Sequence, residues 1–151
     1  MRTTRVIPLV AAVLALGATG CGDFKKDEPQ TAVRDFLAEA LVQQNGQRAC
    51  DYLTQDAQQK IATAGGPGAA CRESMEKAEL VDGDDLVQNT SDVNDLGFDT
   101  SADGHEATVQ VKAGDRTYAF ELRHDEGLGN LYEPKTPWRI ASGAEAVLGA
   151  K

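Results

Sequence analysis

Few side chains in this 151-residue sequence have the type and spacing that proton-transfer chemistry needs. Tyr118 and His124 fall on the same side of a predicted strand, because residues an even number of positions apart point to one face. Tyr52, on a predicted helix, could face the same space, and with Trp138 these side chains outline a possible pocket. A histidine base with a tyrosine hydroxyl as hydrogen-bond donor could transfer a proton there. The competing interpretation is structural, because a histidine at a strand end is usually solvated and a mid-strand tyrosine usually belongs to the core.

Other reactive side chains fit structural roles better than catalytic ones. His105 lies in the predicted turn 102–105, where an exposed histidine needs no ligand. The acidic run 82–85 lacks the later glycine and the distal glutamate of a calcium-binding loop. We therefore predict no metal ion, no cofactor and no catalytic residue. The alternative is a small isomerase or hydrolase that uses His124 and Tyr118.

The N-terminus has the pattern of an export signal. Two arginines precede the apolar stretch Val6–Leu16, which is shorter than the roughly 20 residues that a membrane-spanning helix needs. The next segment, Ala-Thr-Gly-Cys at 18–21, resembles the bacterial lipobox, which implies cleavage before Cys21 and attachment of a diacylglyceryl group with acyl chains such as palmitate. Residues 1–20 are therefore predicted to be a lipoprotein signal peptide. Two acyl chains would hold the protein stably on the outer face of the bacterial cytoplasmic membrane.

The segment 21–29 is predicted to be the lipidated cysteine and a short polar tether, and residues 30–151 the folded domain. Pro29 suits the first turn of a helix. From residue 21 onward the chain has 13 basic and 24 acidic residues, so its net charge is about 13 − 24 = −11. A surface this acidic repels phosphate backbones and anionic head groups. We therefore exclude nucleic acid as a partner and expect the membrane to be an anchor point only.

Cys50 and Cys71 form an even pair in a chain that the signal directs out of the reducing cytosol. We therefore predict a disulfide between them. The alternatives are a metal pair or a catalytic thiol, but neither cysteine lies in a Cys-x-x-Cys motif and the spacing does not fit a zinc site. Closing the loop between the two cysteines would contribute about 3 kcal/mol on the chain-entropy account.

The first half of the domain is predicted to be helical. Apolar residues from Val33 to Leu41 recur at intervals of three and four, which indicates one amphipathic helix that starts at Gln30 and ends at Asn45. Three shorter helices are predicted over 47–53, 55–63 and 69–79. Thr54 is the expected cap of the middle one. The predicted disulfide would join the second helix of the domain to the fourth.

The second half changes to a period of two, which is typical of strands with one buried face. A first strand is predicted over 92–99, and clear alternation follows over 107–112, 117–123 and 138–141. The residues expected to face inward are Phe98, Val109, Val111, Tyr118, Phe120, Leu122, Trp138 and Ile140. Arg139 is expected to face outward. Helices followed by antiparallel strands predict an α+β domain, with the helices on one face of a curved antiparallel sheet of about four strands.

The order and spacing of these elements can be compared with those of known folds. The first helix has the form Val33-x-x-Phe36-Leu37-x-x-Ala40-Leu41, and Ala49-Cys50-x-x-Leu53 leads into a helix and then Cys71. Hairpin strands begin at Ala107, and the last strand begins Trp138-Arg139-Ile140. Together these features resemble the lipoproteins of the nuclear transport factor 2-like superfamily, over residues 30 to about 142. The resemblance implies a cone-shaped α+β domain, but that superfamily includes enzymes, ligand binders and adaptors, so fold alone selects no function.

We therefore predict a membrane-anchored, extracytoplasmic and non-enzymatic domain that binds an envelope protein or a small apolar ligand through a pocket or a sheet face. The inward strand face has no carboxylate to work with His124, which favours binding over catalysis. A third possibility is a structural role, in which the domain spaces or dimerises envelope components through its polar sheet face. That face is predicted to contain Thr108, Gln110, Thr117, Glu121 and Arg123. No oligomeric state follows from the sequence.

Overall fold

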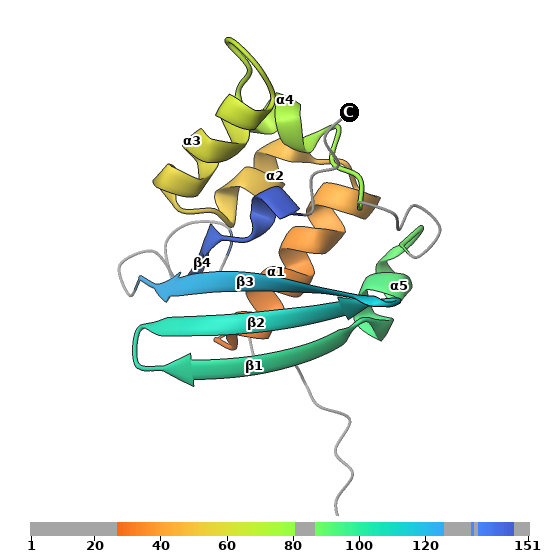
Figure 1. The fold of residues 1–151 in the computed structure, drawn as a ribbon, viewed down its shortest axis with the longest axis vertical. Coiled ribbons are helices and arrows are strands. Elements are labelled where there is room, and N and C mark those ends of the chain that lie inside the picture. The colour runs from red at the N-terminus through yellow and green to blue at the C-terminus, as the bar shows by residue number, and fades with distance from the viewer. Residues whose placement is uncertain (1–26, 81–86, 126–133, 135, 147–151) are drawn as a thin grey trace, which may run out of the picture.

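The structure is a computed structural model that describes residues 27–80, 87–125, 134 and 136–146. Within these ranges, helices are followed by a four-stranded antiparallel sheet, which confirms the predicted α+β class (Figure 1). No helix in the described part of the chain is long and apolar enough to cross a membrane. The predicted signal peptide, Cys21 and most of the predicted tether lie outside the described residues.

The sheet is a simple meander in the order β1-β2-β3-β4. Its strands are β1 (Gly97–Asp103), β2 (Glu106–Ala113), β3 (Arg116–His124) and β4 (Trp138–Ser142). Buried and exposed residues alternate along all of β2 and nearly all of β3, as the period of two predicts. Beyond β4, Leu53 forms a parallel bridge with Ile140, so a short piece of the helical half extends the sheet on that side.

One face of the sheet is covered by helices (Figure 1). They are α1 (Pro29–Leu37), the π-helix η1 (Ala38–Val42), α2 (Gly46–Asp51), α3 (Gln55–Ala64), α4 (Cys71–Met75) and α5 (Thr90–Asp95), with a last 3-10 turn η2 (Ala144–Ala146). The core lies between α1 and the sheet, where the rings of Phe36 and Phe120 meet edge to face with centroids 6.1 Å apart. The predicted inward residues are buried there, except Phe98, which is half-buried at the sheet margin.

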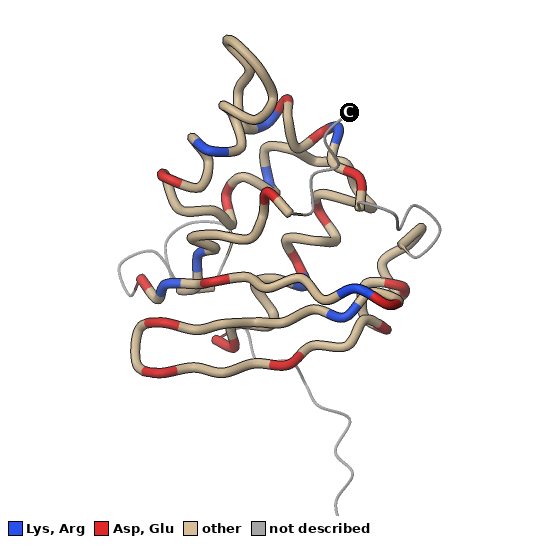
Figure 2. The backbone as a smooth tube through the Cα atoms, in the orientation of Figure 1, with Lys and Arg blue, Asp and Glu red and all other residues tan. Residues whose placement is uncertain are grey.

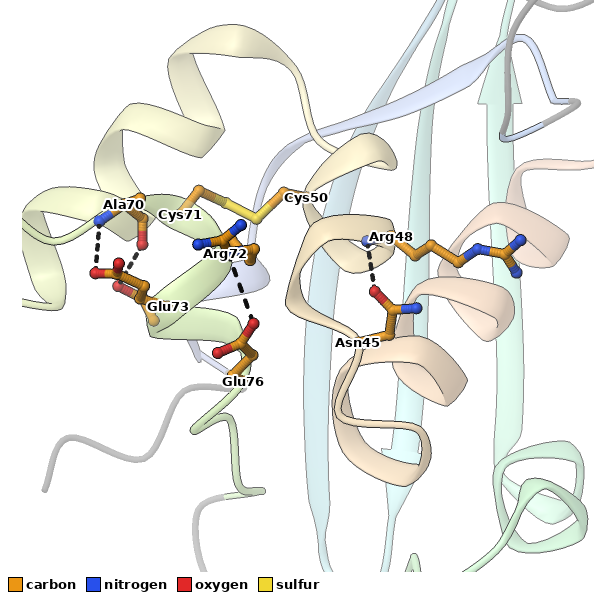
Figure 3. Close-up of polar contacts among 9 residues, drawn as sticks. Asn45, Arg48, Cys50, Ala70, Cys71, Arg72, Glu73 and Glu76 are labelled. Atoms are coloured by element: carbon orange, nitrogen blue, oxygen red, sulfur yellow. Dashed lines mark hydrogen bonds and ion pairs between the residues drawn. A yellow bond between two sulfur atoms is a disulfide. The ribbon is translucent and has the colours of Figure 1, made fainter.

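The predicted disulfide between Cys50 and Cys71 is present and joins α2 to α4, with the two Cα atoms 6.2 Å apart (Figure 3). Beside it the two helices approach very closely. A Cβ atom at Gly46 would collide with the carbonyl oxygen of Arg72, so the absence of a side chain at this position permits the contact. The disulfide and the glycine therefore fix the same helix pair.

The first helix ends earlier than its apolar periodicity predicts. Its regular part stops at Leu37, and the chain continues as the π-helix to Val42, in which the amide of Gln43 donates to the carbonyl of Ala38. Asn45 was predicted to end this helix, but it is the N-cap of α2. Its side chain accepts a hydrogen bond from the amide of Arg48 (Figure 3). By contrast, Thr54 caps α3 as predicted, with its hydroxyl oxygen accepting from the amide of Ala57.

The prediction of a helix over 69–79 is wrong in its length, since α4 covers only Cys71–Met75. The reason lies in the apolar residues beyond it. Met75 and Leu80 are both buried, but five residues apart on one helix they would point about 140° away from each other. The chain therefore leaves the helix after Met75, and both side chains reach the core.

The prediction of a strand over 92–99 is wrong for its first half and confirmed only for residues 97–99. The segment forms α5, and β1 starts only at Gly97. The side chain of Asn89 accepts hydrogen bonds from the amides of Ser91 and Asp92, while the carboxylate of Asp92 accepts from the amide of Asn89. This reciprocal cap stabilises a helical first turn in a segment whose weak apolar pattern suggested a strand.

Candidate functional site

The residues of the predicted pocket do not lie together. Tyr118 and His124 share a face of β3 but are six residues apart, which corresponds to about 20 Å along a strand. Tyr52 lies at the end of α2, beyond the edge of β4, where its carbonyl accepts from the amide of Ile140. His124 and Trp138 are neighbours whose rings are in contact. The structure therefore places Tyr118 too far from His124 to donate a hydrogen bond to it, as the enzymatic alternative requires.

His124 and Trp138 belong to an aromatic cluster at one end of the sheet. Their rings meet edge to face with centroids 4.9 Å apart, and the ring of His105 lies 5.6 Å from that of His124. The Nδ1 atom of His124 is buried and has no hydrogen-bond partner in the described part of the chain, so no described residue holds that nitrogen as the orienting group of a catalytic base would. Within the described ranges, no three His, Cys, Asp or Glu residues are grouped to hold a metal ion.

Trp138 has a structural role that the sequence did not predict. Its indole Nε1 donates a 2.7 Å hydrogen bond to the carbonyl oxygen of Asp27, which lies 111 positions earlier in the chain. Trp138 is itself buried. The bond therefore fixes the entry of the chain into the domain, immediately before α1, to the first residue of β4.

We expect Trp138→Phe to lower the free energy of unfolding by about 1 kcal/mol, because the ring is largely retained while one hydrogen bond is lost. Amide hydrogen exchange between residues 27 and 31 should accelerate in the variant. Unfolding is followed by circular dichroism, since the chain has a single tryptophan. Unchanged exchange at these amides would show that the indole does not hold the entry segment.

Arg139 is buried, although the alternation of β4 predicts that it faces solvent. Its guanidinium donates hydrogen bonds to the carbonyl oxygens of Pro134, Thr136 and Trp138. Burial lowers the pKa of Arg139, and electrostatic interactions with the side chains of Asp125, Tyr52 and Asp51 partly oppose this shift. The alternation along β4 correctly predicts that this side chain lies on the outer face of the sheet. It is buried there because the carbonyl groups of Pro134 and Thr136 cover it.

We expect Arg139→Lys to destabilise the fold by about 2 kcal/mol, because a lysine ammonium cannot span three carbonyl oxygens as the planar guanidinium does. The measurement is a urea unfolding midpoint. Arg123→Lys is the matched control, since Arg123 is exposed on the neighbouring strand and should change stability by less than about 0.5 kcal/mol. Equal effects of the two substitutions would contradict a bracing role for Arg139.

The outer face of the sheet is exposed and polar, as predicted for Thr108, Gln110, Thr117, Glu121 and Arg123. A hollow of about 330 Å³ lies on it. Its lining includes Ser101, Asp103, Glu106, Thr108, Glu121 and Arg123. Figure 2 shows an acidic position on each side of the turn that joins β1 to β2. The candidate interaction site is therefore on the open face of the sheet.

Glu39 is a second charged residue whose burial was not predicted from the sequence. The side chain of Glu39 is 10% exposed and pairs at 3.4 Å with Arg48, which is 62% exposed. Its second oxygen is buried and has no hydrogen-bond partner among the described residues. Glu39 lies in the π-helix, whose wider turn shifts side chains relative to the helical face expected at a spacing of 3.6 residues. The feature of the sequence that could have indicated this burial is an acidic residue between two alanines in an otherwise apolar stretch.

The described residues thus define an α+β domain whose sheet is covered on one face and open on the other. Comparison of the chain with protein-family models, with curated proteins and with solved structures finds no match. The function is inferred from the residues and their arrangement.

Proposed function

We propose that the chain is a lipid-anchored, extracytoplasmic and non-enzymatic binding or adaptor domain of the nuclear transport factor 2-like type. Acylation at Cys21 would anchor it to the outer face of the cytoplasmic membrane, and an envelope protein would bind its open sheet face. The observation that carries the proposal is the difference between the two faces of the sheet. One is filled by the core around Phe36 and Phe120, and the other is exposed, polar and hollowed.

Two further observations support this proposal. The disulfide between Cys50 and Cys71 suits an oxidising compartment, which agrees with export. The fully buried side chains of the inner face occupy the space where a small apolar ligand would have to bind. A protein partner on the open face therefore fits the described residues better than an apolar ligand in the core.

The anchor is tested by metabolic labelling of the producing cells with a palmitate analogue. The wild-type protein should incorporate the label and sediment with membranes, whereas Cys21→Ser should do neither. Cys50→Ser combined with Cys71→Ser is the matched control, and this variant should retain the label. Label incorporation by the Cys21→Ser protein would contradict acylation at that residue.

The binding face is tested by a photo-crosslinking amino acid placed in intact cells at Thr108, on the open face, or at Gln59, exposed on α3. We expect a discrete crosslinked product of one envelope protein from position 108 and none from position 59. The same pattern of products from both positions would remove the support for the sheet face as the binding surface.

A further inference from the structure

The strand β1 forms an open edge of the sheet. The opposite edge, β4, is extended by the parallel bridge between Leu53 and Ile140, and the amide of Thr54 also donates to the carbonyl of Ile140. In the described part of the chain, β1 pairs with β2 alone and no strand lies on its other side (Figure 1). Seven residues of extended backbone are therefore available for strand addition.

The pairing register identifies the free backbone groups of β1. The carbonyl oxygen of His105 points toward β3 and accepts a hydrogen bond from the amide of His124. Because backbone groups of successive residues point to opposite sides, the N–H and C=O groups of Glu106 point toward β1. Glu106 pairs with Asp103, and backbone groups alternate sides along a strand. Phe98, Thr100 and Ala102 consequently direct their N–H and C=O groups to the open side. No hydrogen bond to these backbone groups is present among the described residues.

The outer face beside this edge has an unfavourable concentration of negative charge. Asp103 and Glu106 lie directly opposite each other across the hairpin, and like charges in that position destabilise a sheet. Asp99 projects from the same face of β1. Arg123 lies opposite Glu106 on β3, but among the described residues no ion pair within 4 Å joins them. None of the three carboxylates forms an ion pair within 4 Å in the described part of the chain.

We propose that β1 pairs with an extended segment of a partner protein that carries lysine or arginine at alternate positions. This proposal rests on the proposed binding function and names the chemistry of the partner. An added strand lies about 4.8 Å from β1, so every second side chain would stand over the outer face next to Asp99, Ser101 or Asp103. A lysine or arginine there reaches the hollow and the Glu106 carboxylate. A second copy of the chain fits less well, because it would bring its own Asp99 and Asp103 to the same edge.

The probe is an eight-residue fluorescent peptide that alternates lysine with threonine or valine, added to the purified full-length protein in detergent. We expect saturable binding by fluorescence anisotropy, weakening as salt is raised, and slower amide exchange at Phe98, Thr100 and Ala102. The same peptide with glutamate in place of lysine should not bind. A lysine peptide with a central proline, which cannot complete the hydrogen-bond ladder, should bind more weakly.

Asp103→Asn combined with Glu106→Gln should weaken binding of the lysine peptide about tenfold. The unfolding midpoint of this variant should be unchanged or higher, because a like-charge pair has been removed, and this measurement excludes misfolding as the cause. Asp95→Asn combined with Asp115→Asn is the matched control, since it makes the same change in net charge at the far end of β1 and β2 and should keep affinity within twofold.

Absent binding, equal loss of affinity in both double variants, or exchange protection away from β1 would overturn the proposal. A dimer in sedimentation equilibrium that the peptide fails to dissociate would also overturn it, because a second copy would then occupy the edge. The assay requires neither acylation nor the natural partner. The absence of an acyl group from protein purified from the producing cells would refute the anchor, and peptide binding at β1 in that same protein would leave the strand-addition inference standing.

Discussion

Replacing Phe120 by alanine is expected to lower the free energy of unfolding by about 3–5 kcal/mol, the largest effect of any single substitution considered for this chain. Phe120 is fully buried at the centre of β3 and packs edge to face on Phe36 of α1. The substitution removes most of the apolar contact between the first helix and the sheet, and it leaves a cavity that the surrounding strands cannot close. Chemical denaturation followed by circular dichroism measures the change.

Phe98→Ala is the matched control, because Phe98 faces the same side of the sheet but is only half-buried at the margin. This substitution should lower the free energy of unfolding by about 1 kcal/mol, because it removes less buried apolar surface than Phe120→Ala does. If the two alanine variants lost the same stability, the core would not be centred on the contact between α1 and β3.

Removing the disulfide is expected to have the second largest effect. Cys50 and Cys71 are 21 positions apart, so opening the loop should reduce stability by about 3 kcal/mol on the chain-entropy account. A protein with both cysteines replaced by alanine, and the wild-type protein in reductant, should unfold at similarly lowered denaturant concentrations. The loss should be local as well as global, with faster amide exchange in α2 and α4, which the bond joins.

Cys21→Ser is the control for the disulfide prediction, because it removes the third thiol without touching the bridge. Its unfolding midpoint should equal that of the wild type when both are measured in the same detergent. A reductant that leaves the wild-type midpoint unchanged would contradict a stabilising bridge.

The strands were predictable where one face is buried and the other solvated. In β2 and β3 the alternation of Val109 and Phe120 with polar neighbours defines the strand directly, and Thr54 has the hydroxyl that caps α3. Prediction failed in segments where side-chain capping favours a different structure from the one that the apolar pattern indicates. Asn89 with Asp92 forms a reciprocal cap, and Asn45 begins a helix where it was expected to end one.

The candidate site was harder to predict than the fold. Alternation shows which side chains turn inward, such as Trp138 and Tyr118, but it does not show how much space the covering helix leaves. In the structure α1 fills the inner side with residues such as Phe36, and the hollow is on the other face. Burial of Arg139 has a similar origin, because it depends on a segment that folds over the strand and not on the strand itself.

The hydrogen bond between Trp138 and Asp27 has a consequence for the encounter with a partner. Six peptide units separate Asp27 from Cys21, a reach of at most about 22 Å. If Cys21 carries the lipid, the domain is confined to a thin layer above the bilayer, and its collisions with membrane-bound proteins take place in two dimensions. Local concentrations in such a layer reach about the millimolar range, so an edge strand of modest intrinsic affinity would still be occupied for much of the time.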